Sequence, residues 1–216
     1  MRKYLKSFWF LLMMSFIIAI FSSCSSVKKF TYDKGVVING VKWATRNVDD
    51  PGFFVKEPED AGMFYQWNRQ TGWSTTDPMK NSNGGTEWDN ITPAGNSWKK
   101  TNDPSPAGWR VPTLKEIQTL LDTEKVRSEW TIQKGVTGRK FTDKATGKSL
   151  FLPAAGERNG TNGTLRDADE LGRYWTRTSY KNEGFEEYAY YLFFGKDISF
   201  WYYFRIHGFS IRSVAE

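Results

Sequence analysis

The sequence predicts an α+β domain of loop-rich antiparallel sheets with one or two short helices. Three observations predict this class. From Val36 onward, short apolar or alternating runs are separated by Gly, Asn, Asp and Pro, which is typical of β-structure rich in turns. One capped helix is indicated near the middle of the chain. The C-terminal third consists of alternating, aromatic-rich runs typical of strands.

The first predicted element is a hairpin of residues 36–38 and 41–44. Asn39-Gly40 separates the two runs, and this dipeptide accepts the positive φ angles of a two-residue turn. The domain is therefore expected to open with two paired strands.

Residues 68–108 form the longest irregular stretch, punctuated by turn residues and by three isolated tryptophans, Trp73, Trp88 and Trp98. Long loops in compact domains carry function or are disordered. The tryptophans indicate order, because disordered segments are poor in large aromatic residues.

The predicted helix starts after Pro112. Thr113 and Glu116 form a Thr-x-x-Glu capping box, in which each side chain satisfies a free backbone N–H of the first turn. The apolar residues that follow share one helix face and are expected in the core: Leu114, Ile117, Leu120 and Leu121.

Four strands are predicted in the C-terminal third, over residues 174–178, 189–194, 198–204 and 209–214, with a hairpin turn at residues 195–197. In the last run, Phe209, Ile211 and Ser213 share one strand face. We expect that face to be buried.

The first 23 residues have the composition of an export signal. Basic residues precede an apolar run at residues 8–21, which is shorter than the roughly 20 helical residues needed to cross a bilayer. The segment Phe21-Ser22-Ser23-Cys24 resembles a loose lipobox of the kind found in Bacteroidetes-type lipoproteins. We therefore predict a signal peptide over residues 1–23 and lipidation of Cys24, with a conventional cleavage site as the alternative.

Residues 24–35 are predicted to be a lipidated tether, and residues 36–216 the domain. Cys24 is the only cysteine, so no disulfide can form within the mature chain. Removing the leader deletes three basic and no acidic residues and lowers the formal charge from +6 to +3. Such a mild excess argues against nucleic acid as a partner. The expected location is the outer membrane, with the surface and periplasmic faces both open.

Three segments together resemble the Fibrobacter succinogenes major paralogous domain. They are residues 41–48 (VKWATRNV), residues 106–113 (PAGWRVPT), and the pair Tyr174-Trp175-Thr176 with residues 208–212 (GFSIR). The resemblance implies a C-type-lectin-like fold for residues 36–216. Members commonly carry two cysteines at positions that correspond here to Ser105 and Ser213.

The chain contains few of the residue types that catalytic sites commonly use. His207 is the only histidine, so a zinc site would need carboxylates, and we expect His207 to have a packing or surface role. A pair of carboxylates could hydrolyse glycosides, and the local candidates are Glu157, Asp167, Asp169 and Glu170. No catalytic residue, metal or cofactor is predicted.

The strongest binding signal is the run of five aromatic residues at 200–204. A strand points alternate side chains to opposite faces, so either both faces are covered or one presents rings to solvent. The predicted ligand-binding residues are Trp201, Tyr202, Tyr203, Asp167 and Asp169. The sequence thus predicts a non-enzymatic binding or adhesion module that recognises a glycan or an envelope protein. A structural fimbrial or envelope-complex subunit and a carbohydrate-active enzyme are the alternatives.

Overall fold

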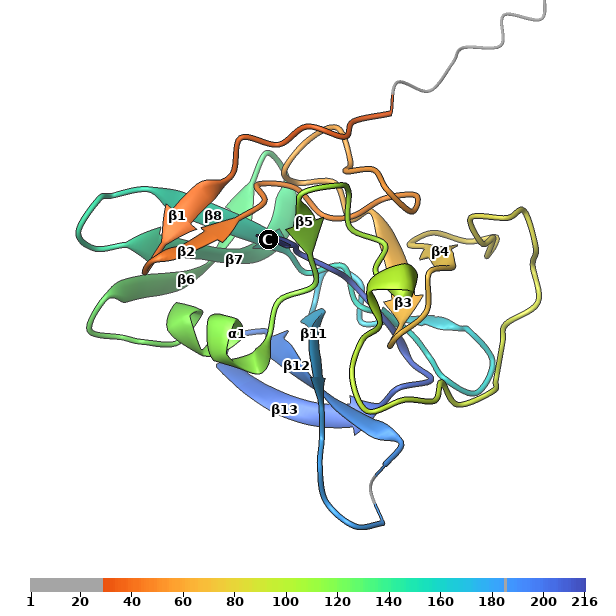
Figure 1. The fold of residues 1–216 in the computed structure, drawn as a ribbon. Coiled ribbons are helices and arrows are strands. Elements are labelled where there is room, and N and C mark those ends of the chain that lie inside the picture. The colour runs from red at the N-terminus through yellow and green to blue at the C-terminus, as the bar shows by residue number, and fades with distance from the viewer. Residues whose placement is uncertain (1–28, 185) are drawn as a thin grey trace, which may run out of the picture.

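The computed structural model describes residues 29–184 and 186–216. Within this range the chain consists mainly of short antiparallel strands with one α-helix and one 3-10 turn (Figure 1). This confirms the loop-rich arrangement of antiparallel sheets. The predicted signal peptide and Cys24 lie outside the described residues. In the described part of the chain, no helix has the length and apolar character needed to span a bilayer.

The strands form four small sheets, and parallel bridges connect residue 156 to residue 172 and residue 174 to residue 210. The first sheet has the order β1 (Val36–Ile38), β2 (Val41–Trp43), β15 (Val214–Ala215) and β5 (Trp109–Arg110). The second has the order β10 (Leu165–Arg166), β9 (Glu157–Arg158), β14 (Gly208–Phe209), β3 (Met63–Gln66) and β4 (Gly72–Ser74). The third has the order β11 (Gly172–Ser179), β12 (Tyr188–Phe194) and β13 (Ile198–Phe204), and the fourth has the order β6 (Val126–Gln133), β7 (Val136–Asp143) and β8 (Ser149–Pro153).

The opening hairpin is confirmed. β1 pairs with β2 in antiparallel register, and the turn residues Asn39 and Gly40 have φ angles of 45° and 79°. Positive φ at both central turn positions is the geometry that Asn-Gly accepts most readily. Asp143 accepts a hydrogen bond from the backbone N–H of Asn39 at 2.8 Å, which ties the turn to the end of β7.

The predicted helix is confirmed as α1 (Leu114–Leu120), and its capping box is complete. Thr113 Oγ1 accepts from the Glu116 N–H at 3.2 Å, and Glu116 Oε2 accepts from the Thr113 N–H at 2.7 Å. Ile117 and Leu120 are buried in a core cluster that also contains Phe141, Leu150 and Leu192. The helix therefore packs on sheets, as its apolar face predicts.

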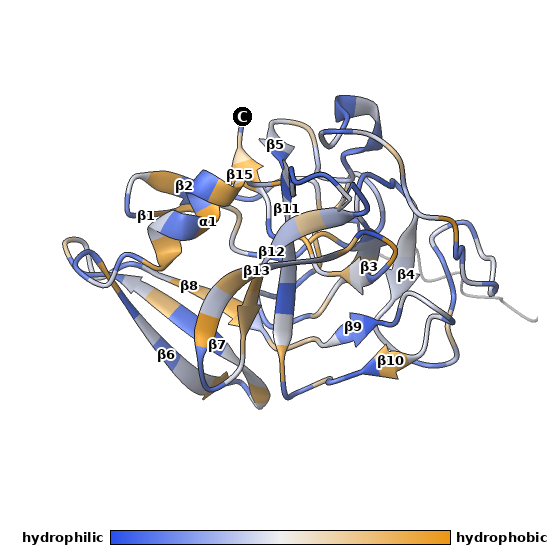
Figure 2. Ribbon diagram, turned by 90° about the horizontal axis from the view of Figure 1, so that it is seen from below, coloured by the Kyte–Doolittle hydropathy of each residue, from blue (hydrophilic) through white to orange (hydrophobic). Residues whose placement is uncertain are grey.

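The β6-β7-β8 sheet was not predicted. Figure 2 shows the cause, since β6 is largely hydrophilic whereas β8 is largely hydrophobic. β6 runs along the outside of the sheet, and most of its residues are partly exposed, so its sequence lacks a clear apolar alternation.

The long irregular stretch is ordered by its aromatic residues. Trp73 and Trp98 are buried, and Trp98 meets Trp67 edge to face at 5.7 Å between ring centroids. The buried Arg158 of β9 reaches across to this region, donating from Nε to the carbonyl of Ser74 at 3.0 Å. The tryptophans thus act as anchors for the loops that contain them.

The C-terminal strands are confirmed up to Phe204, with the 195–197 turn closed by a 2.9 Å hydrogen bond from Gly195 N to Asp197 O. The last run differs from the prediction. Residues 209–214 contribute only the ends of β14 and β15, and Ser210 and Arg212 on the second face are as buried as Phe209 and Ile211 on the first. Sheets cover this segment on both sides.

The chain contacts the domain earlier than the predicted boundary at residue 36. Phe30 bridges to Phe54, whose N–H donates to the Phe30 carbonyl at 2.6 Å. Asp33 is buried and accepts hydrogen bonds from Gly35 N at 2.7 Å, Thr45 Oγ1 at 2.8 Å and Arg46 Nε at 3.0 Å. Part of the predicted tether is therefore docked on the domain.

Replacing Asp33 by Asn should destabilise the protein by about 3 kcal/mol, because it leaves the buried Arg46 guanidinium without its counter-charge. Burial alone raises the pKa of Asp33, but the hydrogen bonds from Gly35, Thr45 and Arg46 outweigh it, so the pKa lies below its ordinary value of 3.8. The stabilisation is therefore fully present above pH 3.8 and is lost as the pH falls through the folded-state pKa.

Urea unfolding at several pH values measures both effects. The control is Asp169→Asn, which changes an exposed carboxylate and should alter the unfolding free energy by less than about 0.5 kcal/mol. An Asp33→Asn variant as stable as the parent would contradict the prediction.

Candidate functional site

The β11-β12-β13 sheet separates the predicted aromatic residues onto two faces. β12 and β13 pair with Tyr191 opposite Trp201, Tyr190 opposite Tyr202 and Ala189 opposite Tyr203. Because side chains alternate along a strand, Trp201 and Tyr203 share one face and Tyr202 lies on the other. The rings of Trp201 and Tyr202 nevertheless stack, with centroids 5.6 Å apart and planes 6° from parallel, so the predicted trio starts from two faces but stays in contact.

Tyr202 belongs to a cluster of rings on the second face. Its ring stacks on that of Tyr180 with centroids 3.9 Å apart, and it meets Tyr188 and Tyr190 edge to face. A hydrogen bond with Tyr180 raises the pKa of Tyr202. Farther along this face, Leu192 and Phe194 enter the main core.

Trp201 and Tyr203 present rings to solvent on the first face. The Trp201 side chain is 59% exposed and that of Tyr203 is 37% exposed. Beneath them the sheet is closed by Trp175 and Tyr191, which pack against Phe209 with centroid distances of 4.2 Å and 4.9 Å. This base contacts the Tyr203 ring, which lies 6.3 Å from both Tyr191 and Phe209, whereas the Trp201 ring stacks on Tyr202 at 5.6 Å. We call the two exposed rings, Trp201 and Tyr203, the aromatic platform.

A polar network of four residues adjoins the aromatic platform. Arg173 of β11 pairs with Asp167 (Nη2 to Oδ2, 2.8 Å) and with Glu157 of β9 (Nε to Oε2, 3.5 Å). His207 Nδ1 lies 3.4 Å from the same Glu157 oxygen. The His207 ring meets the Tyr203 ring edge to face at 4.6 Å, which joins the network to the aromatic platform.

Burial keeps Tyr191, a neighbour of the polar network, neutral. Burial raises the pKa of Tyr191 to about 12, with the Glu157 charge acting in the same direction and Arg173 opposing it. Tyr191 therefore remains protonated at all physiological pH values. His207 is buried between Tyr203 and Phe209, so the predicted packing role is confirmed, with Glu157 as an additional partner.

The predicted carboxylates divide into two groups. Glu157 and Asp167 are held together through one guanidinium, that of Arg173. Asp169 and Glu170 are exposed outside the network, and the backbone N–H of Asp169 donates to the Ala154 carbonyl. Two carboxylates that share one guanidinium leave a net charge of −1, and each carboxylate keeps Arg173 as an ion-pair partner.

Arg173 is the site residue that the sequence did not reveal. The one sequence signal was strand alternation: Arg173 lies two residues before Trp175 in β11, so the two side chains share a face of the sheet. In the described residues, no three His, Cys, Asp or Glu side chains are grouped closely enough to hold a metal ion.

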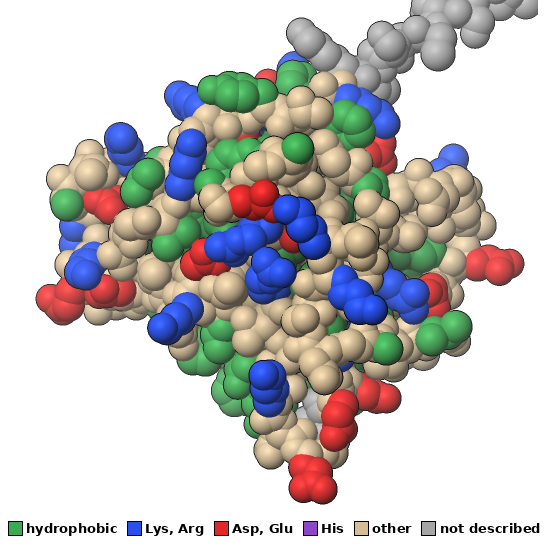
Figure 3. All heavy atoms as spheres, in the orientation of Figure 1, with side chains coloured by type: hydrophobic (Ala, Val, Ile, Leu, Met, Phe, Trp, Pro, Cys, Tyr) green, Lys and Arg blue, Asp and Glu red, His purple; other side chains and the backbone are tan. Residues whose placement is uncertain are grey.

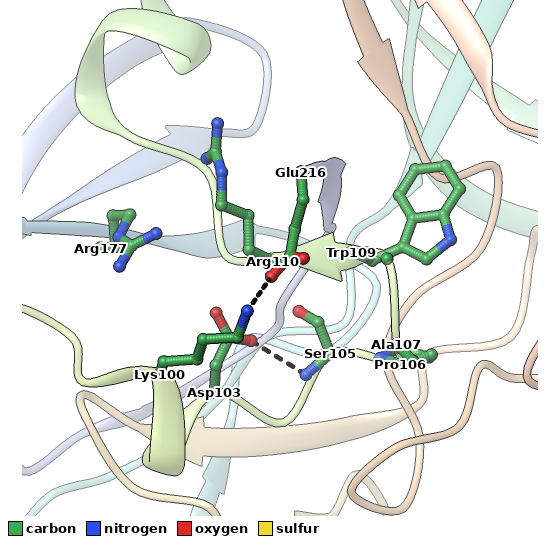
Figure 4. A pocket seen from close by; sticks show the side chains of 10 residues that line it. Lys100, Asp103, Ser105, Pro106, Ala107, Trp109, Arg110, Arg177 and Glu216 are labelled. Atoms are coloured by element: carbon green, nitrogen blue, oxygen red, sulfur yellow. Dashed lines mark hydrogen bonds and ion pairs between the residues drawn. The ribbon is translucent and has the colours of Figure 1, made fainter.

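A second polar feature surrounds β5. A cavity of about 230 Å³ is bounded by β5 and by the η1 turn (Lys100–Asn102), and Figure 4 shows Lys100, Arg110, Arg177 and Glu216 around it. Figure 3 shows Lys and Arg side chains gathered over this part of the surface. The charges are largely compensated, since Lys100 pairs with Glu216 at 3.1 Å and Arg110 with Glu116 at 2.6 Å.

Ser105, which also borders this cavity, lies against Ser213. Their hydroxyl oxygens are 2.7 Å apart across 108 residues of sequence. These two positions are those that the resemblance pairs, and the structure brings them into direct contact.

Comparison of the chain with family models, with curated proteins and with solved structures found no match. The functional argument therefore rests on the residues themselves. Exposed aromatic rings on a sheet whose neighbouring network holds a fixed pair of opposite charges can hold a ligand that offers both an apolar face and hydroxyl groups.

Proposed function

We propose that this chain is an envelope lipoprotein, lipidated at Cys24 on the outer membrane, whose domain binds a glycan on the aromatic platform without catalysing a reaction. The observation that carries the binding proposal is the exposure of Trp201 and Tyr203 together with the contacts that connect Tyr203, through His207 and Glu157, to the Asp167–Arg173 ion pair. Large exposed aromatic residues are costly to leave in water, and a group of them on a rigid sheet is typical of an interaction surface.

The chemistry of a sugar fits these groups. One face of a pyranose ring carries mainly C–H bonds, which pack on an indole, whereas the hydroxyl groups at its rim need donors and acceptors. Asp167 supplies an acceptor, and its side chain is one third exposed, while Arg173 supplies donors. A partly exposed, charge-balanced pair can bind a neutral ligand without stranding a charge.

The domain itself is proposed to be a C-type-lectin-like member of the Fibrobacter succinogenes major paralogous domain family. Support comes from the GWRVPT segment, which leads directly into the capped helix α1, and from the contact between Ser105 and Ser213. The short apolar leader and the lipobox-like FSSC segment support export and lipidation.

Replacing Trp201 by Ala should weaken glycan affinity roughly 30-fold, because an aromatic anchor at a binding surface contributes about 2 kcal/mol. The measurement is a glycan array on residues 25–216 with and without calcium, followed by titration calorimetry of the best ligand. Ile132→Ala is the control, because Ile132 is an exposed apolar residue of β6, in a different sheet from the aromatic platform. Equal losses for both variants, or no glycan bound in either condition, would reject the proposal.

A structural subunit is the second candidate, and one observation favours it. β13 is the outer strand of its sheet, so it offers unpaired backbone groups to another chain. This alternative expects an envelope protein, rather than sugar, to co-purify with the chain. The third alternative, a carbohydrate-active enzyme, has no comparable observation in its favour. Its two candidate carboxylates, Glu157 and Asp167, both pair with Arg173 rather than facing each other across a pocket.

A further inference from the structure

The beginning of the described chain is attached firmly to one side of the domain. Lys29 lies with its ammonium 4.5 Å from the centroid of the Phe53 ring and 3.6 Å from Asp50 Oδ2. Phe30 packs against the second core cluster and bridges to Phe54. With the buried Asp33 a few residues later, the chain cannot leave the domain at any point after Lys29 without losing these contacts.

The distance between the proposed lipid and this attachment is short. Five peptide units separate Cys24 from Lys29, and a fully extended chain advances at most roughly 3.6 Å per residue, so the reach is at most about 18 Å. A domain of this length has a radius of gyration of roughly 16 Å and is on the order of 40 Å across. A lipid in the bilayer therefore keeps the side that carries Lys29 close to the headgroups.

The surface around the attachment point suits that environment. Tyr32 is 78% exposed, more than any other large hydrophobic residue in the described part of the chain. Three exposed lysines lie nearby, of which Lys29 and Lys34 are close to Tyr32 in the sequence. Arg46 brings the segment of Lys56 near Tyr32, because it donates to the carbonyls of both Tyr32 and Val55. Lys29 and Lys56 also pair with Asp50 and Glu57, each at 3.6 Å. Tyrosine and lysine favour the boundary between water and lipid, where a ring or methylene stem is sheltered and the polar end stays hydrated.

The third sheet lies at the other end of the molecule. In Figure 1 the described chain enters at the top, whereas β11, β12 and β13 form the lower end. Seen from below in Figure 2, β12 and β13 are on the near side. The third sheet and the chain entry therefore lie at opposite ends of the molecule.

We propose that the surface formed by Lys29, Tyr32, Lys34 and Lys56 rests on the lipid headgroups and that the β11-β12-β13 sheet is thereby directed away from the membrane. This inference rests on the proposed lipidation of Cys24 but not on the identity of the ligand. It gives the docked segment a function, since a freely moving tether would let the binding face turn toward the bilayer.

The experiment uses the full acylated chain in vesicles of phosphatidylethanolamine and phosphatidylglycerol that contain a lipid with a headgroup-attached contact quencher. One fluorophore is placed at Tyr32→Cys or at Ser199→Cys, both exposed positions. The acylated Cys24 has no free thiol, so labelling is specific. We expect the label at position 32 to lose most of its fluorescence and the label at position 199 to keep most of it.

A flexible Gly-Ser insertion of about twelve residues between Ser26 and Val27 is the matched control, since it relaxes the constraint without touching the domain. It should reduce the quenching at position 32. Equal quenching at the two positions in vesicle-bound protein would overturn the proposed orientation alone. If the parent chain did not float with the vesicles, or floated as well as Cys24→Ser, the lipidation proposal and the orientation would both fail.

Discussion

A variant with Ser105→Cys and Ser213→Cys should form a disulfide and unfold with a free energy about 4 to 5 kcal/mol higher than in its reduced state. The two hydroxyl oxygens are already 2.7 Å apart, so sulfur atoms at these positions need little backbone movement to bond. The closed loop spans 108 residues, and in the chain-entropy model a loop of this length restricts the unfolded chain by that amount.

Guanidinium chloride unfolding with and without reductant measures this gain, in a Cys24→Ser background that removes the only native thiol. Ser213→Cys alone has no partner and should respond to reductant no more than the parent. Free thiols that persist in the oxidised double variant, or a disulfide that leaves the midpoint unchanged, would contradict the predicted geometry.

Replacing Arg212 by Ala should destabilise the protein by about 4 kcal/mol, the sum of a core cavity and lost hydrogen bonds. Arg212 is almost completely buried, and it donates to Asn47 Oδ1 at 2.9 Å and to the Ala44 carbonyl at 3.3 Å. Burial lowers the pKa of Arg212 to about 10, and the nearby Tyr174 and Asp33 oppose that shift. The guanidinium is thus a charged core group whose burial cost is only partly offset by local acceptors, since its Nη2 has no hydrogen-bond partner in the described part of the chain.

Two further variants separate these contributions in urea unfolding. Arg212→Met restores most of the volume but leaves both acceptors unpaired, so it should lose only about 2 kcal/mol. Arg166→Ala, at an exposed arginine of β10, should change the unfolding free energy by less than about 0.5 kcal/mol. An Arg212→Ala loss as small as that of Arg166→Ala would show that the guanidinium is not embedded as described.

Elements with strong local signals were predicted from the sequence. The Asn39-Gly40 turn and the Thr113-Glu116 capping box depend on residues two to four positions apart, and both are present as expected. β6 was missed because it is an edge strand with mostly half-exposed residues, so no apolar alternation marks it. The run at residues 209–214 was predicted as one strand, but it is completely buried and divides its pairing among several partners. Its ends belong to β14 and β15, and Ser210 forms a parallel bridge with Tyr174.

The candidate site shows the same limit. Alternation along β13 places Trp201 and Tyr203 on one strand face and Tyr202 on the other. The prediction of all three as ligand-binding residues did not take this alternation into account. Asp167 was chosen as an acidic loop residue. Its pairing with Arg173 and the meeting of Glu157 with His207 depend on contacts between two strands, β9 and β11, and two loops.

The sequence by itself determined the turns, the capped helix, the strand periods and the absence of internal disulfides in the described domain, because each follows from neighbouring residues or from composition. Only the tertiary structure decided that residues 29–34 are docked, that Arg212 is buried, that Ser105 meets Ser213, and which rings of β13 share a face with Arg173. These features depend on which distant segments become neighbours. Burial and pairing across 100 or more residues are properties of the assembled sheets, which local patterns do not encode.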